Sequence, residues 1–288
     1  MKSLLASVSL TIRELWAARI TQGVFIVTTL AWVFISLALN LDVVEGSIAA
    51  IRILGIESTP LEAVKDPQSG DFIRQALSLE GFVLRINTMV FGGAYLFGTL
   101  LGLFTTMPIL SRFLEPGRLD LMLSKPVSRS RLLSGHIAGI SVTVLGMALY
   151  LILSVWLAIS VKTGVWVPRF LIAIPLIVVM FLVMYSVVLI LGILSRNTGL
   201  GLVTAYGLIF ISLFLAAHEQ ILPVLSGSGS IIYQAFYHML PNYFEVMSIM
   251  AQLGSGESVK DWYPFVSSIL FGGTIYACSF LLFSRRDY

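Results

Sequence analysis

Six long apolar stretches alternate with polar segments along this chain of 288 residues. A helix needs about 20 apolar residues to cross the hydrocarbon core of a bilayer, and each stretch has roughly that length. None of them contains Asp, Glu, Lys, Arg or His. The pattern predicts an all-α membrane protein with six transmembrane helices. The predicted spans are residues 20–40, 86–110, 137–161, 170–194, 199–217 and 263–283.

The basic residues indicate which side of the membrane each connecting segment faces. Segments 1–19, 111–136, 195–198 and 284–288 total 54 residues and carry 11 of the Lys and Arg residues. The opposite segments, 41–85, 162–169 and 218–262, total 98 residues and carry 7. Because cytoplasmic loops are enriched in Lys and Arg, we expect a protein of the cytoplasmic (inner) membrane with both termini inside.

Composition agrees with a lipid environment and excludes several other classes of protein. The chain is 57% hydrophobic and 11% charged, whereas soluble domains carry about 25% charged residues. The net charge of +3 is too small to suggest nucleic acid as a partner. The single cysteine, Cys278, supports neither an internal disulfide nor a structural zinc site.

Residues 1–19 have the pattern of an amphipathic helix that lies along the cytoplasmic interface before the first span. The alternative is a frayed, partly disordered N-terminus. The apolar side chains that share one helical face are Leu4, Leu5, Val8, Ile12, Leu15 and Trp16.

The two outer loops differ in character. Loop 41–85 is charged and interrupted by prolines, and residues 71–84 could form a short helix. Loop 218–262 contains two apolar stretches of helical period, 231–240 and 243–253, separated by Leu240-Pro241-Asn242. We expect a re-entrant helical hairpin here, packed against protein because exposed backbone is not tolerated at membrane depth. A helix lying flat at the interface is the alternative.

Small residues recur at four-residue spacing in two spans. Gly98 and Gly102 lie in the second span, and Gly135 and Gly139 lie at the start of the third. Such pairs let helices approach closely in membranes. We interpret both pairs as packing positions and not as evidence for a dimer.

The sequence lacks the motifs of common catalytic sites. No lysine follows a glycine, so no Walker A loop exists, and no two histidines are four residues apart. We therefore expect a non-enzymatic chain that binds no cofactor of its own. An ion-coupled carrier is disfavoured because such proteins generally place ionisable groups inside the membrane. A non-transporting anchor or sensor subunit remains an alternative.

The cytoplasmic segment 111–136 has the features of a docking element. Pro116-Gly117 ends the extension of the second span, and residues 118–124 can form about two helical turns. Lys125-Pro126 breaks that helix, and Ser128 can cap the third span. The result would be a short helix with one apolar face across the ends of two spans. An ordinary charged loop is the alternative.

The stretch from Glu115 to Arg129, followed by Leu132-Leu133-Ser134-Gly135, resembles the signature after the second span of ABC type-2 exporter permeases. That family has six spans, an N-terminal interfacial helix and an outer helical hairpin with a Leu-Pro-Asn step, which Leu240-Pro241-Asn242 matches. Met122 inside the apolar run is a mild departure from the signature. Among subgroups, the chain is most similar to the permease of the nitrous-oxide-reductase maturation system.

The resemblance implies a permease that pairs with a second copy or a related permease, and with two ABC ATPase subunits that bind ATP and Mg. The cargo would be exported, or mechanical work would be done on a periplasmic partner. The Leu240-Pro241-Asn242 hairpin would cap the outer end of the pathway. The residues implied in ATPase coupling are Glu115, Gly117, Arg118, Leu119, Met122, Leu123, Lys125, Pro126 and Arg129.

Overall fold

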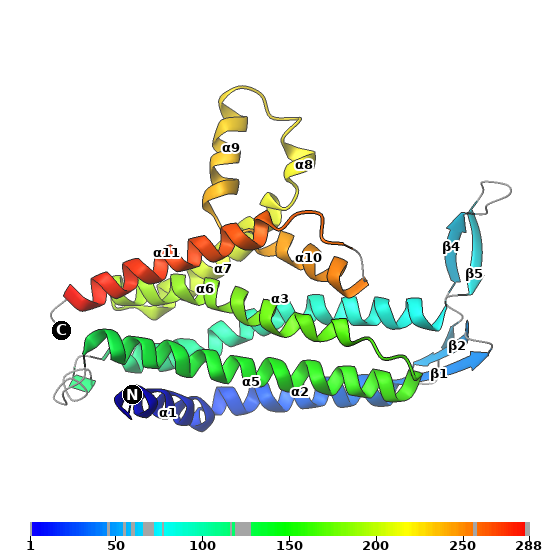
Figure 1. Ribbon diagram of the computed structural model, residues 1–288, viewed down its shortest axis with the longest axis horizontal. Helices are drawn as coiled ribbons and strands as arrows, with labels where there is room; N and C mark the ends of the chain where they lie inside the picture. The colour runs from blue at the N-terminus through cyan, green and yellow to red at the C-terminus, as the bar shows by residue number, and fades with distance from the viewer. Residues whose placement is uncertain are drawn as a thin grey trace.

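The computed structural model describes residues 2–44, 47–53, 56–58, 61–65, 72–76, 78–115, 117–118, 128–255 and 258–285, and for residues 37–76 it describes the backbone alone. Six helices make up the bundle, and their long axes lie roughly side by side in Figure 1. They are α2 (Arg19–Ala38), α3 (Leu79–Phe113), α5 (Arg129–Thr163), α6 (Ala173–Ser195), α7 (Thr198–Leu215) and α11 (Tyr263–Arg285).

Shorter elements surround this bundle. They are the N-terminal helix α1 (Lys2–Ala17), the 3₁₀ turn η1 (Pro168–Ile172) that leads into α6, and the helices between α7 and α11: α8 (His218–Ile221), α9 (Ser228–Met239) and α10 (Tyr243–Ser255). The N-terminus and the C-terminal end of α11 lie at the same end of the bundle, and the strands lie at the other (Figure 1).

Five helices in the described part of the chain are long and apolar enough to span a membrane. They are α3, α5, α6 with its 3₁₀ turn, α7 and α11. The bent pair α1–α2 would add a sixth span if it were counted as one. These helices make the chain a multi-pass membrane protein by length and composition, as the apolar stretches predict.

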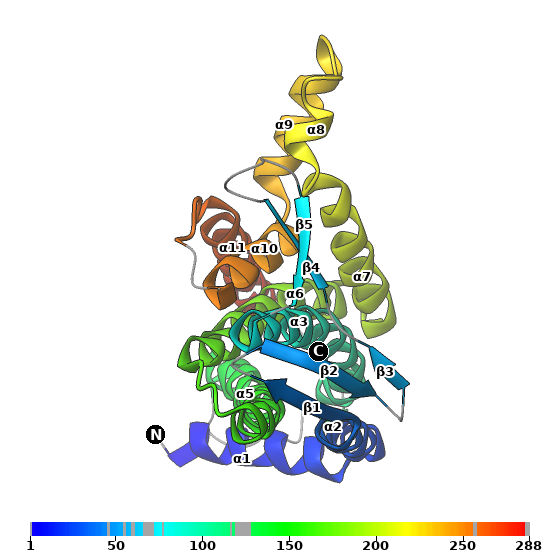
Figure 2. The same cartoon turned by 90° about the vertical axis from the view of Figure 1, so that its right-hand side faces the viewer.

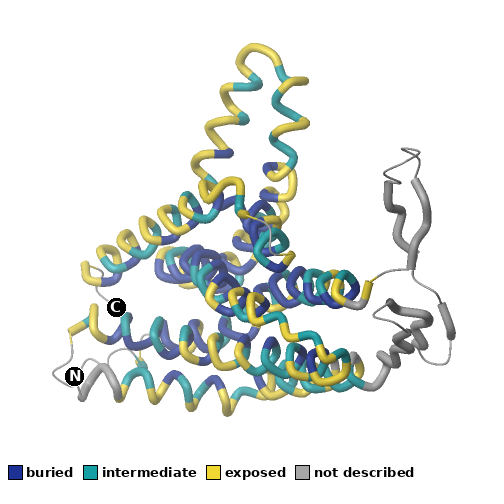
Figure 3. Tube along the Cα trace, turned by 45° about the vertical axis from the view of Figure 1, so that its right-hand side comes forward, coloured by how far each residue is buried: buried dark blue, intermediate teal, exposed yellow. Residues whose placement is uncertain are grey.

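Helix α6 occupies the centre of the bundle. It has the highest mean hydropathy of the five candidate spans, 3.0, and 78% of its most apolar window is buried. Figure 3 shows the buried residues gathering on the central helices, while the outer faces of the bundle are exposed. A helix that is hydrophobic on all sides is expected at the core of a large protein or within a membrane, and α6 is both.

The turn between α6 and α7 follows from two residues. Arg196 adopts a left-handed conformation (φ 55°) that ends α6. The Asn197 side chain then accepts hydrogen bonds from the backbone N–H groups of Gly199 and Leu200, which caps the start of α7. The sequence also predicts that Ser128 caps the third span. Ser128 does stand at the N-cap position of α5, but its side chain makes no capping hydrogen bond.

Helix α1 lies across the end of the bundle and packs along α5 (Figure 2). The chain bends by 68° between α1 and α2. Leu15 and Thr11 of α1 are buried, and the Ser7 hydroxyl donates to the carbonyl of Leu132 on α5. Gly139 makes this contact possible, since a Cβ there would lie 2.6 Å from the Thr11 side chain. The N-terminal segment therefore forms a helix that packs on α5.

The segment between α2 and α3 contains strands, which the sequence pattern does not predict. A three-stranded antiparallel sheet is formed by β1 (Leu39–Val44), β2 (Ser47–Ile53) and β3 (Ile56–Ser58). A separate hairpin pairs β4 (Leu61–Lys65) with β5 (Phe72–Ala76). The short helix considered for residues 71–84 is wrong. Strand β5 occupies its first part, and α3 begins at Leu79, capped by the Ser78 hydroxyl.

The segment between α7 and α11 contains the two helices that its pattern predicts, α9 and α10, with the break at residues 240–242. Helix α10 packs closely against the bundle, and its residues Val246, Ile249 and Met250 are buried. Helices α8 and α9 instead project sideways from the bundle (Figures 1 and 2). On α9, Ile231 and Met239 are about 70% exposed.

A substitution at the α6–α7 crossing tests this packing. A Cβ on Gly201 would lie 2.8 Å from the Val188 carbonyl oxygen and 2.9 Å from its Cα. We expect Gly201→Ala to cost about 1–3 kcal/mol of stability, since backbone atoms must move. Thermal unfolding of the purified protein in mild detergent measures the loss.

Gly207→Ala on the same helix is the matched control. A Cβ there meets nothing within 4 Å, so the variant should unfold at or slightly above the wild-type temperature because alanine favours the helix by up to about 1 kcal/mol. Equal unfolding temperatures for Gly201→Ala and Gly207→Ala would contradict the close crossing.

Candidate functional site

The end of the bundle that carries both termini also carries the segment singled out by the sequence. Helix α3 ends at Phe113, and Glu115 is exposed just beyond it. The Arg118 backbone N–H donates to the Glu115 carbonyl. Gly117 and Arg118 follow, and Arg129 opens α5. The remaining implied coupling residues, Leu119, Met122, Leu123, Lys125 and Pro126, lie outside the described residues.

Arg118 forms an ion pair with Glu14 of helix α1. The two side chains are 27% and 20% exposed, so the pair is partly shielded from water and contributes about 1 kcal/mol. The ion pair joins two parts of the chain that are 104 positions apart. It connects Arg118, in the segment after α3, to helix α1, which packs on α5.

A buried cluster fixes the helices beneath this ion pair. The His136 ring on α5 stacks on Phe113 of α3, with ring centroids 4.2 Å apart. Its Nε2 is 3.1 Å from the Tyr185 hydroxyl on α6. Phe113 also stacks on Phe283 of α11 at 6.0 Å. Four helices therefore meet at one place, so that a displacement of α3 at this end would be transmitted to α5, α6 and α11.

The break between α9 and α10, at Leu240-Pro241-Asn242, is anchored to helix α11. Asn242 is 1% exposed, and its backbone N–H donates to the Ser268 hydroxyl at 3.0 Å. Its side-chain amide donates to the Tyr237 carbonyl and to the Ser267 hydroxyl. The break is thus a well-packed joint and not an open loop.

Tyr243, the first residue of α10, joins this helix to α3. Tyr243 and Tyr95 stack with ring centroids 4.3 Å apart. Each hydroxyl donates to the backbone carbonyl of the other residue, both at 2.8 Å. Both side chains are fully buried. This reciprocal pair holds the start of α10 against the second predicted span.

Beside this joint, the structure brings together three titratable groups that the sequence reading did not single out. The Tyr237 hydroxyl donates to Glu245 Oε2 at 2.8 Å, and His218 Nδ1 lies 2.9 Å from Glu245 Oε1. Burial, as the largest cause, raises the pKa of the Glu245 carboxyl above its ordinary value, although both partners oppose the shift. The sequence does mark Glu245 as unusual, because it is the only acidic residue in the apolar stretch 231–253.

The Glu245 carboxylate borders a polar cavity of about 330 Å³. Its lining brings together residues of α8, α9, α10 and the segment before α11. The polar residues that line it are His218, Glu219, Gln220, Tyr237, Glu245, Ser248, Gln252, Lys260 and Asp261. In the described part of the chain, no group of three or more His, Cys, Asp or Glu side chains is arranged to hold a metal ion.

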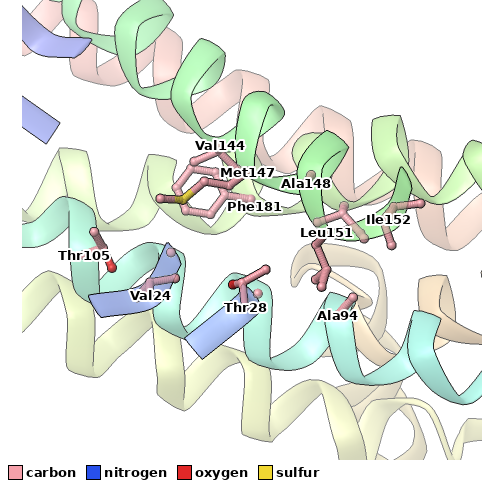
Figure 4. Close-up of a pocket in the computed structure, with 13 residues that line it drawn as sticks. Val24, Thr28, Ala94, Thr105, Val144, Met147, Ala148, Leu151, Ile152 and Phe181 are labelled. Atoms are coloured by element: carbon pink, nitrogen blue, oxygen red, sulfur yellow. The ribbon is translucent and has the colours of Figure 1, made fainter. Parts of the chain in front are cut away.

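An apolar groove opens between α2, α3 and α5, with α6 as its floor (Figure 4). Its inner part, of about 70 Å³, reaches Ile177 and Phe181 of α6. Its outer part, of about 280 Å³, lies between Val27 of α2 and Phe97 of α3. Its lining residues belong to the helices that form the predicted spans.

The chain matches no protein-family model and no curated protein. Its function must therefore be inferred from its own residues.

The raised pKa of Glu245 predicts a pH-dependent stability. The folded state binds this proton more tightly than the unfolded chain does. Above the folded pKa, the buried charge therefore lowers the stability of the folded protein. This loss of stability is relieved as the pH falls through the folded pKa towards 4.5, the ordinary value of the carboxyl group. Glu245→Gln removes the charge, so the variant should show a flatter profile of unfolding temperature against pH, measured from pH 4 to 8.

Glu219→Gln is the control, since Glu219 lines the same cavity and is exposed. Its profile should follow that of the wild-type protein. Identical profiles for all three proteins would show that the buried carboxylate does not govern the pH dependence.

Proposed function

We propose that this chain is the permease subunit of an ATP-driven exporter, with six spans, both termini in the cytoplasm and no ATPase activity of its own. ATP and Mg would bind to a separate pair of ABC ATPase subunits, and a second permease copy would complete the transporter. The cargo would be exported, or work would be done on a periplasmic partner.

The ion pair between Arg118 and Glu14 carries the proposal. Arg118 belongs to the segment that resembles the coupling signature of ABC type-2 permeases, where an ATPase would dock. Through Glu14, that segment is connected to α1, whose Leu15 and Thr11 are buried against the bundle. An ATPase that moved the segment would therefore act on α3 directly and on α5 through α1.

The absence of charge in the predicted spans also favours an external energy source. Ion-coupled carriers place ionisable groups where the ion passes. The one buried histidine near the cytoplasmic end of the bundle, His136, is stacked on Phe113 and hydrogen-bonded to Tyr185. Its side chain is 1% exposed, so these contacts shield the ring from water.

The outer elements suit a role in contacting another protein. The strands of residues 39–76 lie beyond the ends of α2 and α3, and α8 and α9 project to one side (Figure 1). These elements favour mechanical work on a periplasmic partner over simple passage of a small solute. An anchor or sensor subunit would use the same surfaces, and only the presence of an ATPase partner separates the two functions.

A charge-swap series tests the coupling role. We expect Arg118→Glu and Glu14→Arg each to reduce the amount of ABC ATPase that co-purifies with the tagged protein in mild detergent, because each places like charges together. The double variant should restore much of the loss, since it rebuilds the pair in reverse. The measurement is the ratio of ATPase to permease in the purified complex.

Glu80→Arg serves as the control, because this exposed residue opens α3 at the opposite end of the bundle. It should leave the ratio unchanged. Purification of the wild-type chain without any ATPase, in several detergents, would instead favour the anchor or sensor function.

A further inference from the structure

Helix α2 is attached to α5 and leaves a gap towards α3. The Thr29 hydroxyl and the Trp32 indole N–H both lie within hydrogen-bond distance of the Tyr150 hydroxyl on α5, at 2.9 and 3.1 Å. Phe25 stacks on the same tyrosine ring at 4.7 Å. Contacts between α2 and α3 are much fewer than those between α2 and α5. The groove lies along this sparsely packed seam.

Small residues of α3 keep the groove open. Ala94, Gly98 and Gly102 recur every four residues and therefore share one face of the helix. A Cβ added at Gly98 would meet nothing within 4 Å, and the same holds at Gly93. The Gly98–Gly102 pair is thus not used for close helix contact at Gly98, which differs from the packing role expected from its spacing. Gly98 lines the hollow instead, next to Ala94, which Figure 4 labels at its edge.

The inner and outer cavities form one continuous groove. They share the lining residues Val24, Thr28, Ala94, Gly98 and Leu151. Along α3 the lining runs from Val90 to Thr105, which corresponds to about 22 Å of helix. One leaflet of the hydrocarbon core is about 15 Å thick. The groove is therefore long enough to hold an extended hydrocarbon chain that enters from one leaflet.

The chemistry of the lining excludes water and charged ligands. Among the residues whose side chains the structure describes, none that lines either cavity is charged, and Thr28 and Thr105 are the only polar ones. The Thr105 hydroxyl already donates to the Leu101 carbonyl at 2.6 Å. Apolar cavities stay dry, and one of about 150 Å³ binds benzene. The outer cavity alone, at about 280 Å³, has room for a longer hydrocarbon.

The mouth of the groove is continuous with the surface that faces the bilayer. Val27 on α2 and Phe97 on α3 stand at the mouth, and they are 58% and 62% exposed. Leu30 and Phe34 extend the exposed apolar surface along α2. In a membrane-spanning bundle such residues contact lipid tails, so a lipid can reach the groove sideways without crossing water.

We propose that the groove between α2, α3 and α5 binds one acyl chain of a bilayer phospholipid, which enters laterally past Val27 and Phe97. The headgroup stays at the membrane surface, because the lining offers it no polar partner. This proposal goes beyond the ATP-coupled function and does not depend on it, since a chain can occupy the groove whether or not an ATPase is bound.

Photolabelling tests the proposal on the full chain. The protein is reconstituted in vesicles of phosphatidylethanolamine and phosphatidylglycerol that contain a trace of phosphatidylethanolamine with a diazirine in one acyl chain. After irradiation, labelled peptides are mapped by mass spectrometry. We expect labels concentrated on the peptides that contain Val24–Thr28 and Ala94–Leu101, above the level on the exposed faces of α7 and α11.

Substitutions that fill the groove sharpen the test. Gly98→Phe should lower groove labelling about tenfold, which corresponds to about 1.4 kcal/mol, roughly the burial of two methylene groups. Gly93→Phe is a second filling variant, in case the first does not fold. Gly273→Phe is the matched control, because this glycine is exposed on α11 and a Cβ there also meets nothing within 4 Å. It should label the groove as the wild-type protein does.

Two results would overturn the proposal. One is labelling spread evenly over all lipid-facing helices, which would mean that the groove holds no chain preferentially. The other is unchanged groove labelling in correctly folded Gly98→Phe and Gly93→Phe proteins. Either result would leave the ATPase ratio of the charge-swap series unaffected, so a failure here is distinguishable from a failure of the exporter assignment.

Discussion

Helix α6 is in close contact with the backbone of two other spans, because a glycine stands at each crossing. Gly201 of α7 lies against Val188, and Gly272 of α11 lies against the Cα of Val183. Lipid tails are as apolar as these side chains, so burial alone gives helices in a bilayer little reason to associate, and small residues that allow close packing supply much of the attraction. The positions of α7 and α11 around α6 depend on these two residues.

Buried contacts join the helices at two places along the bundle. At the end that carries the termini, His136 and Phe113 join α3, α5, α6 and α11. Further along α3, the Tyr95–Tyr243 pair joins this helix to α10. Helix α3 takes part in both joints, so it connects the end where an ATPase would act to the outer helices. The α8–α9 arm is attached more lightly, through contacts such as that of Tyr233 with the Phe214 carbonyl.

Local pattern in the sequence predicts the helices well, and contacts between distant residues explain what it misses. Apolar length and the Pro241 break locate the bundle helices, α9 and α10, although α3 begins seven residues and α5 eight residues before the predicted spans. In the strands of residues 39–76, alternation of apolar and polar residues is limited to short stretches such as Leu39–Val43, and their pairing is set by partners elsewhere in the segment. Glu245 meets His218 from 27 positions away. The spacing of Gly98 and Gly102 predicts close helix packing at both residues. In the structure, α2 is bound to Tyr150 of α5 and leaves the space next to Gly98 open.

The two proposals meet at the seam between α2 and α3. Helix α1 packs on α5, and α2 is fixed to α5 through Tyr150, so α1, α2 and α5 form one connected group. The segment with Arg118 follows α3, and its ion pair with Glu14 connects that group to α3 at the end that carries the termini. A force that moved Arg118 relative to Glu14 would act across the seam where the groove lies. Because α2 and α3 share few contacts, such a movement would change the width of the groove, and with it the hold on an acyl chain.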